Sequence, residues 1–223
     1  MMAKKVLLCG CAALFACSSV SAASFNVRQE FCSESGESTR VKIGSSIGNF
    51  NYSGELKFKP VDGSDKKSSQ NNGWELGLDY RFKINDNWTV VPGMPIEARE
   101  KGMTYKPQIR VNYAVDSIPG LTLTARYRHD FYRNNSDVDK QRHRLTTGFG
   151  YTTRDWKFGF EADLYKAVDY NIYDNGDTNY ELNLTVARKM GQWTPYVEFG
   201  DTNVSNDSPD RELRTRIGLT YSY

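Results

Sequence analysis

Apolar and polar residues alternate along most of the chain, in runs of about ten residues that turn-rich segments separate. In the clearest run, WELGLDYRFK, Trp74, Leu76 and Leu78 share one parity, whereas Glu75 and Asp79 share the other. Successive side chains of a strand point to opposite faces, so each run predicts a strand with one apolar and one polar face. Helical periodicity is almost absent, and the pattern therefore predicts an all-β protein.

Twelve such runs follow one another along the chain. They span residues 24–31, 39–46, 50–59, 74–83, 88–99, 104–113, 121–131, 142–151, 156–165, 180–187, 193–200 and 212–223. The fifth is the weakest, because Pro92 and Pro95 cannot donate to a sheet ladder and fit a strand only where it bulges.

The segments between the runs alternate as well. Those after the odd-numbered runs are mostly long and polar, such as VDGSDKKSSQNN, and those after the even-numbered runs are tight, such as TTRD. An even number of strands, with long loops at one end and short turns at the other, is typical of bacterial outer-membrane barrels. The sequence therefore predicts a transmembrane antiparallel up-and-down β-barrel of twelve strands.

Aromatic residues agree with this prediction. Trp74, Trp88, Trp156 and Trp193 begin runs on the apolar parity, as expected of an aromatic girdle at a membrane interface. A secreted antiparallel sandwich is the alternative, because it shows similar alternation. The dense arginine on the polar faces and the outward Tyr223 at the chain end favour the barrel.

The first 22 residues read as a secretory signal peptide. MMAKK is basic, VLLCGCAALFACSSV is apolar but too short to span a bilayer, and small residues allow cleavage after Ala22 or Ala23. A lipoprotein signal ending at Cys17 is the rival, although Phe15 fits that motif poorly. Residues 23–223 are then expected to form one barrel domain.

Cleavage changes the composition. Cys32 becomes the single cysteine, so no internal disulfide is possible. Loss of Lys4 and Lys5 lowers Lys+Arg from 29 to 27, which equals the 27 Asp+Glu. A neutral chain gives no reason to expect a nucleic-acid partner. No apolar stretch of 18 residues occurs after the signal, and no transmembrane helix is expected.

The charges are nevertheless sorted by face. Parity assigns about seventeen Lys and Arg, but only about eleven Asp and Glu, to the polar interior face. From this set we predict the following pore-lining or substrate-binding residues: Arg28, Arg40, Lys42, Arg81, Arg99, Arg110, Arg126, Arg128, Arg142, Arg144, Arg214 and Arg216.

Two functions compete for this interior face. Eight-stranded barrels are filled by side chains and sixteen-stranded ones are open, so twelve strands allow both a filled wall and a channel. The basic surplus favours a channel for anions, because arginine binds carboxylates through a planar fork and rows of Arg or Lys favour anion passage.

An enzyme is the third possibility. Only His129 and His143 could serve as a base, and both lie on the outward parity. A lone Cys with two separated histidines cannot form a metal cluster. Neither enzymatic activity nor a metal or cofactor is expected.

Several segments match a known family in their order along the chain. They are Pro107 followed by Arg110, the pair Arg126 and Arg128, the stretch WTPYVE at Trp193–Glu198, and the closing ELRTRIGLTYSY. With the surrounding runs, they resemble the oligogalacturonate-specific monomeric porin family (KdgM type), which includes a sialic-acid channel. The likeness covers essentially the whole chain after the signal, and the unpaired Cys32 is its one departure.

The resemblance implies a monomeric twelve-stranded barrel in the outer membrane of a Gram-negative bacterium. Its lumen would carry arginine tracks that pass acidic oligosaccharides such as oligogalacturonate, or sialic acid; a general small-anion porin and a closed structural or enzymatic barrel remain alternatives. Outer-membrane lipid and the barrel assembly machinery would be its other partners. Tyr165 and Tyr196, also on the inward parity, could offer rings to passing sugars, although wall packing is the simpler role.

Overall fold

A computed structural model describes residues 23–61, 69–135 and 138–223, so the predicted signal peptide lies outside the described residues. The strands are β1 Ser24–Cys32, β2 Gly36–Ile47, β3 Phe50–Pro60, β4 Ser69–Tyr80, β5 Phe82–Lys83, β6 Trp88–Gly93, β7 Ile96–Arg99, β8 Gly102–Tyr105, β9 Gln108–Ala114, β10 Leu121–Asn134, β11 Lys140–Thr153, β12 Trp156–Val168, β13 Thr178–Arg188, β14 Trp193–Asn203 and β15 Arg211–Ser222. No helix in these ranges is long and apolar enough to cross a membrane.

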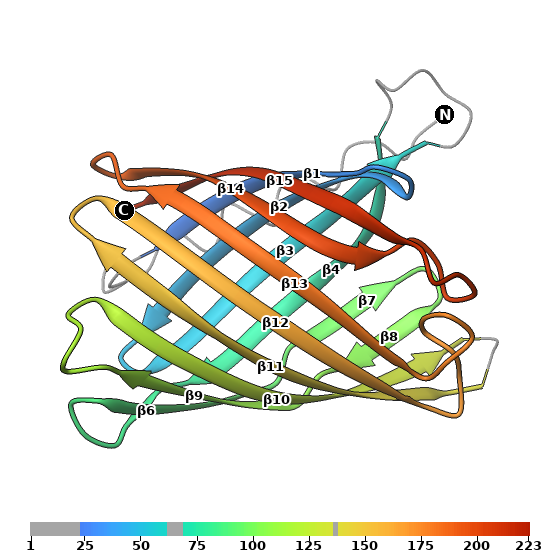
Figure 1. Cartoon of the computed structure of the whole chain (residues 1–223), viewed down its shortest axis with the longest axis horizontal. Coiled ribbons are helices and arrows are strands. Elements are labelled where there is room, and N and C mark those ends of the chain that lie inside the picture. Colours follow the sequence, from blue (N-terminus) through green and yellow to red (C-terminus); the bar gives the residue numbers. More distant parts are fainter. Residues whose placement is uncertain (1–22, 62–68, 136–137) are drawn as a thin grey trace, which may run out of the picture.

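The strands form one antiparallel sheet that closes on itself (Figure 1). β1 pairs with β15 over its whole length, from Ser24 opposite Ser222 to Cys32 opposite Arg214. β10 in turn pairs with β11 on one side and with β8 and β9 on the other. The described segments therefore make a closed barrel of twelve strands, as the sequence predicts, and the closure leaves no open sheet edge in the membrane.

Three of the twelve barrel strands are interrupted, which is why fifteen segments appear within the described residues. β4 continues into β5, β6 into β7 and β8 into β9. Pro95 and Pro107 lie in two of the interruptions, because proline has no N–H for the ladder. Their carbonyls still accept hydrogen bonds from Lys106 N at 2.9 Å and His129 N at 3.0 Å, so the wall stays continuous there.

The strand pairing places the apolar and the charged residues of each strand on opposite faces of the barrel wall. In β1, Phe25, Val27 and Phe31 are 36–39% exposed on the outer face, and Arg28 and Glu30 face the interior. This outward exposure of large apolar side chains recurs around the barrel and matches a surface that meets lipid. A shift of one residue would move the charges of a strand into lipid, and the register is therefore strongly specified.

The strands reach further than the sequence pattern predicts. β4 begins at Ser69, so Trp74 lies inside that strand and the prediction that Trp74 starts one is wrong. β10 and β11 likewise continue to Asn134 and back to Lys140. Strand pairing outside the lipid needs no apolar face, and alternation of hydrophobicity therefore reports only the part of a strand that lies within the membrane.

Loop lengths follow the prediction only in part. The connections 61–68, 169–177 and 204–210 are long, but 33–35 and 100–101, at the same end of the barrel, are as short as turns. The opposite end carries mostly tight turns, such as 48–49 and 154–155, together with the C-terminus (Figure 1). We refer to these two ends as the loop side and the turn side.

A buried carboxylate secures the first turn on the loop side. Glu212, on β15, accepts hydrogen bonds from the backbone N of Glu34 at 2.8 Å and of Ser35 at 3.0 Å, and from the Ser35 hydroxyl. These contacts join the β1–β2 turn to the strand that closes the barrel.

Replacing Glu212 by Ala should lower the free energy of unfolding by about 1–3 kcal/mol, because the backbone donors of the turn lose their acceptor. Urea unfolding in detergent micelles measures this change. Glu34→Ala is the matched control, since the exposed Glu34 side chain makes none of these bonds. Equal stability of Glu212→Ala and Glu34→Ala would contradict the assigned role.

Candidate functional site in the barrel interior

Charged side chains on the inner wall form three networks. The first joins Arg40, Glu55, Lys57, Glu75, Glu97, Arg99 and Lys106. Lys57 Nζ lies 2.8 Å from Glu97 Oε1 and 3.2 Å from Glu75 Oε2, and Lys106 Nζ lies 2.7 Å from the same Glu75 oxygen. Lys106 also contacts Glu97, and Lys57 lies 3.7 Å from Glu55. Each ammonium group is thus shared between at least two carboxylates, and the network links neighbouring strands of the wall.

The second network covers β10, β11 and β12. Its members are Arg126, Arg128, Asp130, Arg142, Arg144, Glu161 and Asp163. Asp130 is fully buried and is bound by Arg128 at 2.7 Å and Arg142 at 2.8 Å. The equally buried Asp163 accepts two bonds from Arg144, at 2.6 and 2.7 Å. This bidentate pairing is the strong form of an arginine–carboxylate contact.

The third network closes the barrel across β13, β14, β15 and β1. Arg216 binds Glu30 at 2.6 Å and also Glu198, and Arg214 binds Glu181 at 3.0 Å. Each of the three networks is within one charge of neutrality. Arg40, Arg99, Arg126, Arg128, Arg142, Arg144, Arg214 and Arg216, eight of the predicted site residues, are therefore already engaged with carboxylates of the wall.

The remaining four predicted residues have no such partner. Arg28, Lys42, Arg81 and Arg110 make no side-chain hydrogen bond or ion pair to any other described residue, and Arg28 Nε is buried without an acceptor. These four unpaired side chains therefore carry part of the positive surplus inferred from parity. They lie in two cavities of the interior.

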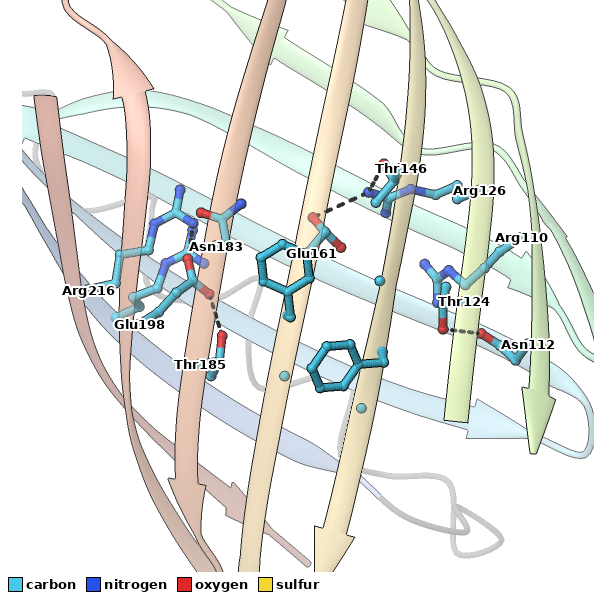
Figure 2. A pocket seen from close by; sticks show the side chains of 16 residues that line it. Arg110, Asn112, Thr124, Arg126, Thr146, Glu161, Asn183, Thr185, Glu198 and Arg216 are labelled. Carbon is cyan, nitrogen blue, oxygen red and sulfur yellow. Dashed lines mark hydrogen bonds and ion pairs between the residues drawn. The ribbon is translucent and has the colours of Figure 1, made fainter. Parts of the chain in front are cut away.

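The central cavity has a volume of about 500 Å³ and contains Arg28 and Arg110. Figure 2 shows Arg110 and Arg126 on one side of it, next to Thr124 and Thr146, and Arg216 on the other side near Thr185, with Glu161 between the two sides. Arg126 donates to the Thr146 hydroxyl at 3.0 Å and lies 3.8 Å from a carboxylate oxygen of Glu161.

Uncharged residues also shape this cavity, and selecting candidates by charge alone missed them. Asn112, Thr124 and Asn183 line it, as do Gly148, Gly150 and Gly159. A Cβ at Gly150 would meet no atom within 4 Å, so the missing side chain leaves open space. The inward parity of these residues was the signal that could have identified them.

A second cavity lies at the turn side. Its volume is about 520 Å³, and Lys42 and Arg81 line it together with serine, asparagine and glycine residues of β2, β3 and β4. Asp79 is its one acidic lining residue and accepts a hydrogen bond from Asn51 Nδ2 at 2.5 Å. This cavity is therefore polar and carries a net positive charge.

The two inward tyrosines pack within the wall. The Tyr165 ring is 7% exposed and lies 4.7 Å from the Arg142 guanidinium carbon and 5.2 Å from that of Arg144. Tyr196 covers Gly218, where an added Cβ would come within 2.2 Å of the tyrosine ring. Tyr165 thus separates two arginines, and Tyr196 fills the space left by a glycine of the neighbouring strand.

His129 and His143 lie on the outer face of the barrel, as their outward parity predicts. Tyr127 Oη contacts His143 Nδ1 at 2.7 Å, and His129 Nε2 lies 3.1 Å from Gln141 Oε1. Residues 23–61, 69–135 and 138–223 hold no group of three or more potential metal ligands. Cys32 carries a free, half-buried thiol to which nothing in the structure assigns a role.

Comparison with known proteins gives a family for this geometry. Residues 16–223 match the family model described as "Oligogalacturonate-specific porin protein (KdgM)". The chain is 32% identical over 157 residues to the uncharacterized protein YiiY of Salmonella typhimurium, which covers 69% of this chain and 67% of that protein. It is 28% identical over 220 residues to the oligogalacturonate-specific porin KdgM of Dickeya dadantii, with 91% and 92% covered.

Solved structures show the same fold. The NanC porin superposes with a TM-score of 0.74 at 23% identity and covers 88% of this chain and 98% of its own. The KdgM porin superposes with a TM-score of 0.68 at 24% identity, with 90% and 99% covered.

The shared carboxylate of the second network generates a prediction. Asp130→Asn should lower the free energy of unfolding by roughly 3 kcal/mol, because two buried guanidinium groups lose their counter-charge. Asp86→Asn is the control, since the Lys83–Asp86 pair is exposed and its loss should leave the urea midpoint unchanged. An unchanged midpoint for Asp130→Asn would show that the network does not stabilise the wall.

Proposed function

The chain belongs to the family of oligogalacturonate-specific porins (KdgM), and from this membership we propose that it lets acidic sugars diffuse passively through the barrel interior. Its location is the outer membrane of a Gram-negative bacterium. The cargo we propose is an acidic oligosaccharide such as oligogalacturonate, the sugar in the names of the family and of the Dickeya relative.

The distribution of unpaired cations carries this proposal. Wall carboxylates neutralise most of the inward arginines, but Arg28 and Arg110 in the central cavity and Lys42 and Arg81 in the turn-side cavity lack counter-charges among the described residues. A carboxylated sugar would supply them. Because each cavity holds only two such cations, binding at any one place stays weak enough for release.

Arginine suits this cargo for a geometric reason. The guanidinium plane donates two parallel hydrogen bonds to a carboxylate, whereas a chloride ion accepts them at one point. Threonine and asparagine side chains beside Arg110 and Arg126 add donors and acceptors for sugar hydroxyls (Figure 2). The site therefore favours a carboxylated carbohydrate over a simple anion.

Sialic acid is the second candidate cargo. A protein 27% identical over 180 residues is the N-acetylneuraminic acid outer membrane channel protein NanC of Escherichia coli. Both sugars carry one carboxylate per ring, and uptake by a porin-deficient strain grown on each acid distinguishes them. A general small-anion porin would support growth on both and show no preference between them.

A closed structural barrel and an enzyme are weaker alternatives. The paired networks alone would suit a filled wall, but they leave the two cavities and their four cations unexplained. Two of the relatives named above are a porin and a channel, which favours transport over catalysis. We propose that the chain works as a monomer, with outer-membrane lipid and the barrel assembly machinery as its remaining partners.

Replacing Arg28 and Arg110 together by Ser should reduce anion preference in planar bilayers. One charge at about 7 Å changes the energy of a passing ion by about 0.6 kcal/mol in water, so each substitution should lower the anion-to-cation permeability ratio by about threefold or more. The reversal potential across a salt gradient measures this ratio.

Arg188→Ser with Lys189→Ser is the matched control, because it removes two positive charges from the turn-side end of β13 and the following turn, outside the cavities. Cation preference in the wild-type protein, or no conductance at all, would overturn the proposed function. Unchanged preference in the Arg28 and Arg110 variant would assign selectivity to the paired arginines instead.

Gly150→Leu tests whether the central cavity lies on the conduction path. A leucine there should fold without strain, because a Cβ at this position meets open space. Single-channel conductance should fall while the unfolding midpoint stays unchanged. Gly54→Leu is a control, since Gly54 lies outside both cavities and also has free space beyond its Cα. Equal conductance in both variants would place the ion path elsewhere.

A further inference from the structure

The loop between β12 and β13, residues 169–177, folds into the barrel mouth on the loop side. Ile172 is 7% exposed and packs against Tyr165 and Ala167, which face the interior from β12. Tyr170 packs on the same cluster. A loop that contacts inward-facing side chains must lie within the rim of the barrel, and it therefore narrows the opening.

This loop is held in place by its neighbour, residues 204–210. Asn175 N donates to Asn206 O at 3.1 Å, and the Tyr173 hydroxyl donates to Pro209 O at 2.6 Å. Asn203 Nδ2 donates to Ile172 O at 3.3 Å. These three bonds, all in the central part of the loop, fix it to the neighbouring segment of the mouth.

Tyr170 presents its ring to a cation at this mouth. Lys140 Nζ lies 5.1 Å from the Tyr170 ring centroid, and Lys140 is an exposed, inward-parity residue at the start of β11. Burial raises the pKa of the Tyr170 phenol, so the ring stays neutral. No ion pair joins Lys140 to a carboxylate among the described residues.

A file of cations leads inward from Lys140. Arg142 and Arg144 follow on the same face of β11, and Arg142 lies between the rings of Tyr132 and Tyr165, at 5.6 and 4.7 Å. The file continues toward Arg126, which lines the central cavity. Lys140 is the outermost member, where an entering sugar would arrive first.

We infer that Tyr170 and Lys140 form an entrance subsite for one acidic pyranose ring, built by the inward-folded β12–β13 loop. The inference rests on the proposed transport of acidic sugars. A sugar ring takes the face of Tyr170 that Lys140 now covers, and the ammonium moves aside to pair with the sugar carboxylate. The exchange is easy because an exposed cation–ring contact is weak and the lysine stem is flexible.

Single-channel block by trigalacturonate tests the subsite. In the full mature protein, Tyr170→Ala should lower the on-rate of block by at least about threefold, the scale of one aromatic contact. The fall should occur for addition from one side of the bilayer only, because the subsite lies at one mouth. Tyr170→Phe keeps the ring and should retain the wild-type on-rate.

Lys140→Gln tests the contribution of the ammonium group separately from that of the Tyr170 ring. It should slow block by trigalacturonate from the same side and leave block by neutral maltotriose unchanged. An on-rate equal to wild type in both Tyr170→Ala and Lys140→Gln, in a protein that trigalacturonate does block, would overturn the subsite alone. Absence of block and of anion preference in the wild-type protein would instead overturn the proposed function.

Discussion

The structure depends on one constraint, that a strand crossing lipid can keep charge on only one of its faces. A closed barrel satisfies every backbone donor and acceptor through its neighbours, and the outer side chains must then be apolar. Nearly every charge of the membrane-spanning wall is therefore forced inward. Inside, the charges must either find partners on adjacent strands or stay accessible to water and solutes.

The inward-facing cations of the barrel fall into two groups, paired and unpaired. Most arginines bind carboxylates one or two strands away, as Arg144 binds Asp163 and Arg216 binds Glu30. These pairs span several strands and give the wall its rigidity. Arg28 and Arg110 lie among hydroxyl, amide and glycine residues instead, and their charge acts on whatever occupies the cavity. Structural and solute-facing cations are thus mixed along the same strands.

Alternation along the chain was enough to predict the all-β class and the twelve strands. It could not predict which arginines are paired, because a pair such as Arg142 with Asp130 depends on cross-strand register and rotamer, which no local pattern encodes. Nor could it place Tyr170 and Ile172, since a loop has no parity. The misplaced start at Trp74 has the same origin, because β4 extends past the region where alternation is visible.

The division between paired and unpaired cations has a consequence for how such a protein diversifies. Changing Asp130 or Asp163 would weaken the barrel itself, so those positions are held by folding. Arg28, Lys42, Arg81 and Arg110 support no other side chain, and exchanging them alters the interior field at little structural cost. The same barrel wall can therefore be adapted to different solutes. Substitution of a few unpaired side chains changes the solute preference, and the folding of the barrel is unaffected.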